Sequence, residues 1–214
     1  MLALNNRWRP DVLALKPFGA GGELGDIFYV RAGLLNRKVR ILRPTWRHRK
    51  ATAGGGALMD LGVQALDLAL WMLDYPRIDR VLCHLHPGER MEVEDSAALT
   101  LKCARGPVIS LQVTWNLFGQ RDRQYLEMLG TRGSASLSPM AVYKEVEQGL
   151  LDVTPGVTGQ RGNIYTASYR QMLDHFAEAC RGECEQELPV EQVELMRILS
   201  LAYESAARGK EIKL

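Results

Sequence analysis

The segment from residue 57 to residue 73 is almost entirely apolar, and it constrains the fold more than any other part of the chain. Its sequence is ALMDLGVQALDLALWML. A helix with apolar side chains on nearly every face must be covered on most sides. The run falls short of the roughly 20 apolar residues of a membrane span, and two aspartates interrupt it. We therefore expect a helix buried inside a layered domain.

Two segments after this helix alternate between apolar and polar side chains, which is the period of a half-buried β-strand. They cover residues 95–103 and 108–116, with the turn-forming sequence ARGP between them. The apolar face consists of Ala97, Leu99, Leu101, Cys103, Ile109, Leu111, Val113 and Trp115, and the polar face of Thr100, Lys102, Ser110, Gln112 and Thr114. Such a hairpin belongs to an antiparallel sheet with one core side and one wetter side.

The rest of the chain predicts more strands than helices. We expect strands over residues 24–35, 80–86, 123–129, 135–137, 141–146 and 150–154. Helices are expected to begin at Pro10, near Tyr165 and after Pro189, and Pro17 should interfere with the first of them. Helical spacing in the second involves Tyr165, Tyr169, Met172, Leu173, Phe176 and Cys180. The pattern predicts an α+β fold, a large and mostly antiparallel open sheet with helices covering one face.

Charge argues against nucleic-acid binding. The net charge is only +2, from 27 basic and 25 acidic residues, whereas nucleic-acid binders carry a dominant basic face. The basic residues that do cluster are Arg37, Lys38, Arg40, Arg43, Arg47, Arg49 and Lys50. A phosphate or nucleic-acid patch is one interpretation, and a solvated loop beside an acidic substrate or partner is the favoured one.

The four cysteines indicate reduced thiols in the cytoplasm. Cys180 and Cys184 lack the two-residue spacing of a zinc knuckle, and no second Cys/His pair follows them. We therefore expect no metal site. The first residues are too few for a signal peptide, and no membrane association is expected.

The three glycines at 54–56, directly before the apolar helix, suggest a functional site. Glycine lets the backbone approach a ligand closely, and free N–H groups at a helix start can bind a polar or anionic substrate group. Asp60, Gln64 and Asp67 follow at i, i+4 and i+7, on one stripe of the helix. The simpler alternative is that Asp60 only stabilises the helix dipole and Asp67 only pairs with an arginine.

Five segments in order resemble the Gfo/Idh/MocA oxidoreductases. The most informative is GGGALMDLGVQALDLALW at residues 54–71. The others are NNRWRP (5–10), LGDIFYVRA (24–32), GTRGSA (130–135) and YESAARGK (203–210). Together they span essentially the whole chain.

The resemblance implies the C-terminal domain of such an enzyme, similar to that of glyceraldehyde-3-phosphate dehydrogenase. Residues 1–23 would be a remnant of the last Rossmann strand and its linking helix, and residues 24–214 the substrate-binding and oligomerisation domain. Asn5 and Arg7 would contact the cofactor, which is NAD or NADP in the family. The sequence contains neither a G-x-G-x-x-G turn nor a Glu-Lys-Pro segment, so we expect the N-terminal Rossmann domain to be absent and NAD(P) not to bind this chain alone.

The family's catalytic aspartate corresponds to Asp60, and its usual histidine is replaced by Gln64. Glutamine can orient a hydroxyl group but cannot titrate near neutral pH. By position, Gly55, Gly56, Trp46 and Arg47 would bind the substrate.

Two functional hypotheses follow from the resemblance. The first is the substrate-binding domain of an NAD(P)-dependent sugar or polyol dehydrogenase, inactive without a Rossmann-domain chain as partner. The alternative is a non-catalytic binding or oligomerisation module. In either case we expect a homo-oligomer formed through the polar face of the sheet.

Overall fold

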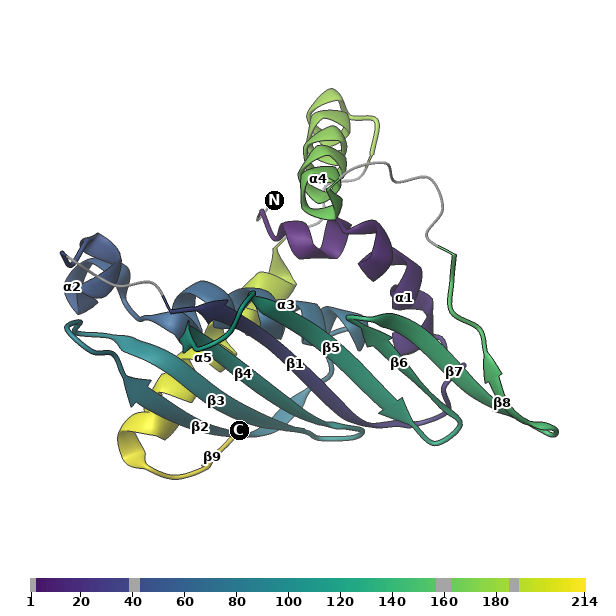
Figure 1. Cartoon of the computed structure of the whole chain (residues 1–214), viewed down its shortest axis with the longest axis horizontal. Coiled ribbons are helices and arrows are strands. Elements are labelled where there is room, and N and C mark those ends of the chain that lie inside the picture. Colours follow the sequence, from purple (N-terminus) through teal and green to yellow (C-terminus); the bar gives the residue numbers. More distant parts are fainter. Residues whose placement is uncertain (1–2, 39–42, 157–162, 185–188) are drawn as a thin grey trace.

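A single mixed sheet organises the computed structural model, which describes residues 3–38, 43–156, 163–184 and 189–214. From one edge to the other its strands are β8 (Gly149–Asp152), β7 (Met140–Val146), β6 (Gly133–Leu137), β5 (Arg123–Gly130), β1 (Ile27–Arg37), β4 (Val108–Leu117), β3 (Glu94–Cys103), β2 (Ile78–Pro87) and β9 (Ile212–Lys213). The helices lie over one face of this open sheet (Figure 1). The predicted α+β class and architecture are confirmed.

The first strand lies in the middle of the sheet. β1 pairs in parallel with β4 and antiparallel with β5. Each of the other strand pairs in the described chain is antiparallel, including the predicted hairpin of β3 and β4. Parallel neighbours require a long crossover connection. Here the apolar helix belongs to that crossover, which explains why it is covered by the sheet.

The helices are η1 (Asn5–Trp8), α1 (Pro10–Ala20), η2 (Trp46–His48), α2 (Lys50–Ala53), the π-helical turn η3 (Leu58–Gly62), α3 (Val63–Met72), α4 (Ile164–Arg181) and α5 (Val190–Arg208). Contrary to expectation, α1 continues past Pro17 for another turn. A proline removes one helical hydrogen bond. Burial of Val12 and Leu15 on the same helix offsets that loss.

The core lies between the inner face of the sheet and the apolar helix. Leu66, Leu70 and Met72 of α3 are completely buried. The predicted inner face of β3 and β4 is buried as well, except that Trp115 is only half-buried. On the opposite face Thr100, Lys102 and Gln112 are exposed. No helix in the described part of the chain combines the length and apolarity needed to cross a bilayer.

α4 departs from the sheet. In Figure 1 it stands above α1, away from the strands, and it packs on η1 and α1. Only Met172 and Ser168 on this helix are buried. Its other apolar side chains remain accessible, with exposed fractions of 52% for Tyr165, 57% for Leu173 and 43% for Phe176. An amphipathic helix therefore has an apolar face that nothing in the described chain covers.

The start of the chain forms no strand. Ala3 and Leu4 have no regular structure, and η1 begins at Asn5. Residues 1 and 2 of the predicted strand remnant, and Arg40 of the basic cluster, lie outside the described residues. A strand needs a neighbouring strand for its backbone groups, and none lies beside Ala3 and Leu4.

Candidate active site

A cavity of about 630 Å³ opens where β1 and β4 end and β3 begins. Its walls come from the end of β1, the η2 segment, the η3 turn, the β2–β3 connection and the end of β4. The lining residues are Asn36, Arg37, Lys38, Arg43, Arg47, His48, Asp60, Glu89, Arg90, Met91, Asp95, Trp115 and Asn116. Segments distant in sequence thus converge on one pocket that combines charged groups with an aromatic wall.

Asp60 lies in this wall, on the π-helical turn η3. The N–H of Val63 donates to the carbonyl of Leu58, five residues earlier, before regular α-helix resumes. Single π-turns of this kind occur often at functional sites, because they shift the side chains that follow. The Asp60 carboxylate accepts a hydrogen bond from Trp115 Nε1 at 3.1 Å. With 35% of its side chain exposed, this carboxylate is held in place yet still accessible to a ligand.

Trp46 and Arg47, which both belong to η2, lie beside Asp60. Arg47 Nη1 is 4.0 Å from Asp60 Oδ2, and its guanidinium lies 5.5 Å from the centre of the Trp46 ring. A second cavity of about 170 Å³ adjoins the first and is lined by Trp46, Arg47, Gly55, Gly56 and Asp60, among others. The structure therefore brings together most of the residues that the sequence assigned to substrate binding and catalysis.

The glycines have a different role from the one expected of their N–H groups. Glu94 Oε1 accepts from the backbone N–H of Gly56 at 2.9 Å and of Leu58 at 3.0 Å. The predicted anion site at the helix start is thus occupied by the protein's own carboxylate. A Cβ at Gly56 would lie 1.9 Å from the Glu94 carbonyl oxygen, and one at Gly55 would lie 1.9 Å from Tyr203 Oη. Glycine is required here for packing against β3 and α5.

Gln64 does not line the main cavity. Its Nε2 donates to the backbone carbonyl of Asp60 at 3.0 Å, and its Oε1 accepts from Asn6 Nδ2 at 3.3 Å. The amide thereby ties the π-turn to η1. In this conformation it stabilises the position of Asp60 and does not reach into the pocket.

Arg7 and Asp67 belong to a largely buried polar network, and Asn5 is bonded separately to Ser168. Asp67 is 1% exposed and accepts from Arg7 Nε at 2.8 Å and from Tyr75 Oη at 2.5 Å. Arg7 also pairs with Glu191 at 2.6 Å. Burial lowers the pKa of Arg7, but Asp67, Glu191 and Tyr75 together raise it by more, so the pKa lies above its ordinary value. Burial, reinforced by Asp67, raises the pKa of Tyr75. The simpler interpretation of Asp67, that it pairs with an arginine, is confirmed.

The bonds of Asn5 and Arg7 also concern the cofactor, because these two residues were expected to contact it. Asn5 donates to Ser168 Oγ at 3.0 Å, and the guanidinium of Arg7 is used by Asp67, Glu191 and Tyr75. In this arrangement both side chains are engaged within the domain, and their expected contact with the cofactor stays a prediction.

A sequence model described as the GFO/IDH/MocA C-terminal domain matches residues 12–136. The chain belongs to the GFO/IDH/MocA family. It is 24% identical over 229 residues to D-glucoside 3-dehydrogenase of Escherichia coli (strain K12), covering 98% of this chain and 63% of that protein. It is 27% identical over 158 residues to levoglucosan dehydrogenase of Pseudarthrobacter phenanthrenivorans, covering 63% of this chain and 40% of that enzyme. The chain thus spans less than two thirds of either relative.

Solved structures agree on the fold. Levoglucosan dehydrogenase in complex with NADH and levoglucosan has a TM-score of 0.83 at 22% identity, covering 100% of this chain and 66% of that one. GenD2 from gentamicin A biosynthesis, in complex with NAD, has a TM-score of 0.78 at 26% identity. The match covers 99% of this chain and 62% of the GenD2 chain. These two solved structures thus contain NADH and NAD respectively.

Asp95 and Asn116 also line the cavity of this GFO/IDH/MocA domain, although neither was predicted as a site residue. Asp95 is 4% exposed and accepts from Asn116 Nδ2 at 3.1 Å and from Ser96 Oγ at 2.7 Å. His86 Nδ1 lies 3.1 Å from it. Asn116 Oδ1 is buried and has no partner among the described residues. One signal was available, because Asp95 is in phase with the apolar residues of its strand and a carboxylate at such a position is seldom buried without a purpose.

Proposed function

We propose that this chain is the substrate-binding domain of an NAD(P)-dependent sugar or polyol dehydrogenase, with the cavity around Asp60 as its substrate site. The observation that carries the proposal is the Asp60 carboxylate, which Trp115 holds in the cavity wall at 3.1 Å and which Arg47 approaches to 4.0 Å. The names of the two curated relatives, a glucoside dehydrogenase and a levoglucosan dehydrogenase, support a sugar as the substrate class.

The residues of this chain would bind and orient the substrate. A carboxylate is a strong acceptor for a sugar hydroxyl group. Asp60 would therefore accept from the hydroxyl to be oxidised and take its proton, while Arg47 donates to a neighbouring oxygen. The exposed ring of Trp46 offers an apolar face against which a sugar ring can pack. The hydride acceptor would be held by a nucleotide-binding domain and not by this chain.

The charge of the cavity favours acidic sugars within the proposed substrate class. Five cationic side chains line it, Arg37, Lys38, Arg43, Arg47 and Arg90, against three anionic ones, Asp60, Glu89 and Asp95. Arg90 has a positive φ of 61°. Such a backbone conformation is costly for a residue other than glycine and is found preferentially at ligand sites. Arginine binds carboxylates through two parallel hydrogen bonds, so an aldonate or uronate would fit better than a neutral sugar.

A Rossmann-domain partner would cover the exposed apolar face of α4. Tyr165, Leu173 and Phe176 are accessible on a helix whose main packing within the described residues is on η1 and α1. Folded monomers rarely leave a continuous apolar surface of this kind open. The relatives have at least a third of their length beyond the part matched here, which is enough for a domain that binds the nucleotide and rests on this helix.

The alternative, a non-catalytic binding or oligomerisation module, rests on Gln64. Its amide is bound to the Asp60 carbonyl and to Asn6, so no titratable group stands beside Asp60 at that position.

Under either proposed function, self-association would use the open face of the sheet. On that face Arg31 pairs with Glu127, and Tyr125 donates to Gln112. A monomer at tens of micromolar by sedimentation would contradict this assembly.

Ligand-observed NMR on the purified chain tests the proposed site. Gluconate and glucuronate should bind more tightly than glucose or sorbitol, and Asp60→Asn should weaken binding at least about tenfold, as expected for a bond to a charged group. The control is Asp174→Asn, an exposed carboxylate on α4 outside both cavities. Binding of gluconate by the Asp60→Asn variant as tight as that by wild type would contradict the site.

Calorimetry tests whether a partner domain is needed to bind the cofactor. Micromolar affinity of the isolated chain for NADH would contradict that need.

A further inference from the structure

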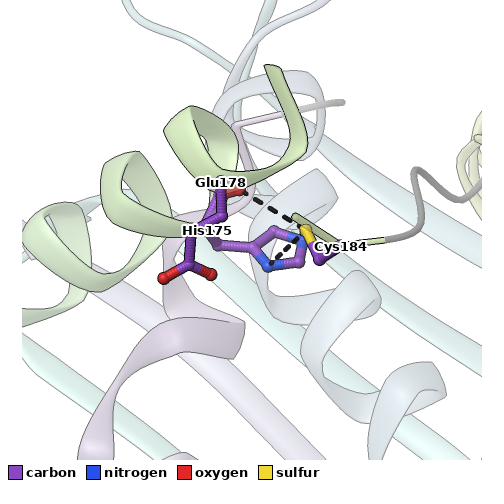
Figure 2. A group of neighbouring side chains, drawn as sticks. All are labelled: His175, Glu178 and Cys184. Atoms are coloured by element: carbon purple, nitrogen blue, oxygen red, sulfur yellow. Dashed lines mark hydrogen bonds between the residues drawn. The ribbon is translucent and has the colours of Figure 1, made fainter. Parts of the chain in front are cut away.

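The C-terminal end of α4 brings together three side chains of a kind that bind transition metals, well away from the cavity around Asp60. His175 and Glu178 lie one turn apart on α4, and Cys184 follows the helix. One donor atom of each lies within 4.8 Å of the others, and His175 Nδ1 is 3.8 Å from Cys184 Sγ. Figure 2 shows the imidazole and the sulfur facing each other beside the last turns of the helix.

The helix ending explains how Cys184 reaches the histidine. Gly182 adopts the left-handed conformation with φ 74°, and its N–H donates to the carbonyl of Ala179 at 3.1 Å. The N–H of Glu183 donates to the carbonyl of Glu178 at 3.0 Å. This pair of bonds is the Schellman ending, which reverses the chain over the final turn. Cys184 is thereby placed beside α4 rather than beyond it.

The imidazole also contacts an aromatic ring. Trp8, on η1, packs against His175 with ring centroids 4.7 Å apart and ring planes tilted by 36°. A metal ligand whose ring is already immobilised loses little conformational entropy on binding. Contacts to Cys184 are weak by comparison, since its thiol lies 3.8 Å from the ring nitrogen and 3.9 Å from the His175 carbonyl. Both separations are near the outer limit for a hydrogen bond to sulfur.

The separation of nitrogen and sulfur suits a bridging ion. A zinc ion with a Zn–N bond of about 2.0 Å and a Zn–S bond of about 2.3 Å separates these ligands by about 3.5 Å in a tetrahedron. Glu178 is exposed, and one of its carboxylate oxygens lies within 4.8 Å of the other two donor atoms. Thiolate and carboxylate together would balance the two charges of the ion, and a mixed N, O and S donor set selects zinc or a similar borderline metal over magnesium or calcium.

We propose that His175, Glu178 and Cys184 bind one zinc ion, with water as the fourth ligand, and that this ion fastens the segment after α4 to the helix. The spacing of Cys180 and Cys184 predicted no metal site, because it does not show that Cys184 lies beside His175. Cys180 lies five residues beyond His175, which is about 140° around the helix. It therefore lies off the stripe of His175 and Glu178 and serves as an internal control.

The test measures how strongly zinc protects the thiols of Cys180 and Cys184 from alkylation in the same molecule. The reduced, full-length chain is titrated with zinc and then alkylated, and each cysteine is read by peptide mass spectrometry. One equivalent of zinc should slow the alkylation of Cys184 at least about tenfold and leave Cys180 unchanged. His175→Ala should abolish the protection, while Cys180→Ser should keep it.

Cobalt provides a second measurement that does not depend on the reactivity of the thiols. One equivalent of Co²⁺ should give a thiolate-to-cobalt charge-transfer band in wild type and in Cys180→Ser, and none in Cys184→Ser. Equal protection of both cysteines, or a band retained in Cys184→Ser, would overturn the proposed site, as would the absence of saturable binding in wild type. Circular dichroism confirms that each variant is folded before it is scored.

Discussion

Glu94 Oε1 lies 2.9 Å from the backbone nitrogen of Gly56, at the start of the helical turn that carries Asp60. The same oxygen accepts from the N–H of Leu58 and from Tyr203 Oη at 2.8 Å. Burial, reinforced by the Glu94 carboxylate, raises the pKa of Tyr203, which keeps this phenol protonated as a donor. The protein thus supplies its own anion at the helix start, and recognition of a substrate is left to the side chains around Asp60.

Gly56→Ala should strongly destabilise the fold. The new Cβ would lie 1.9 Å from the carbonyl oxygen of Glu94, and neither backbone segment can move without breaking the Glu94 hydrogen bonds. We expect a loss of at least about 2 kcal/mol in the free energy of unfolding, measured by urea denaturation. Gly119→Ala is the matched control, because the nearest atom to its Cβ is 3.6 Å away. A similar stability for both variants would argue against the close packing.

Asp67→Asn should be costly because it leaves the buried guanidinium of Arg7 without its principal counter-charge. Removing one partner of a buried pair typically destabilises by about 3 kcal/mol or more. The comparison is Glu204→Gln, which breaks the exposed pair with Arg208, whose side chains are 40% and 56% exposed. That change should alter stability by less than about 1 kcal/mol. Urea denaturation distinguishes the two variants. Equal losses in the free energy of unfolding would mean that other groups compensate the charge of Arg7.

Trp115→Phe should weaken substrate binding without unfolding the domain. The change keeps an aromatic ring against the core but removes the Nε1 donor that holds Asp60. Loss of one hydrogen bond of about 1 kcal/mol corresponds to roughly fivefold weaker binding of an acidic sugar. Trp8→Phe, outside the cavity, is the control and should bind normally. An unchanged affinity in Trp115→Phe would show that Asp60 needs no support from this side chain.

Stability should fall as the pH rises above about 9. Burial raises the pKa of the Cys83 thiol from 9.0 to about 12, and that of Cys103 to about 11. Between those values the unfolded chain releases protons that the folded protein retains, so the free energy of unfolding decreases with pH. The expected slope is up to about 1.4 kcal/mol per pH unit for each thiol. Cys83→Ala should therefore give a flatter pH profile than wild type, measured by denaturation from pH 8 to pH 11, and identical slopes would contradict the assignment.

Local sequence pattern determined most of the secondary structure. The alternation in β3 and β4 and the turn between them are local features, so the hairpin and its inner face could be predicted. Glycines at 182 and 209 ended α4 and α5 as expected, with φ values of 74° and 61°. The stretch from Gly54 to Asp60 could also be predicted as a candidate site from the sequence, because carboxylates in an apolar helix need a partner or a purpose.

Tertiary structure decided what depends on contacts between distant residues. Periodicity does not encode which strands are neighbours, so the central position of β1 and its parallel pairing with β4 appeared only in the fold. The partners of Asp67 and Gly56, which are Arg7 and Glu94, lie 60 and 38 positions away. The exposure of α4 was likewise decided by tertiary structure. Its apolar residues have the spacing of a helix packed on one face, but that face is exposed, because burial depends on which element lies opposite.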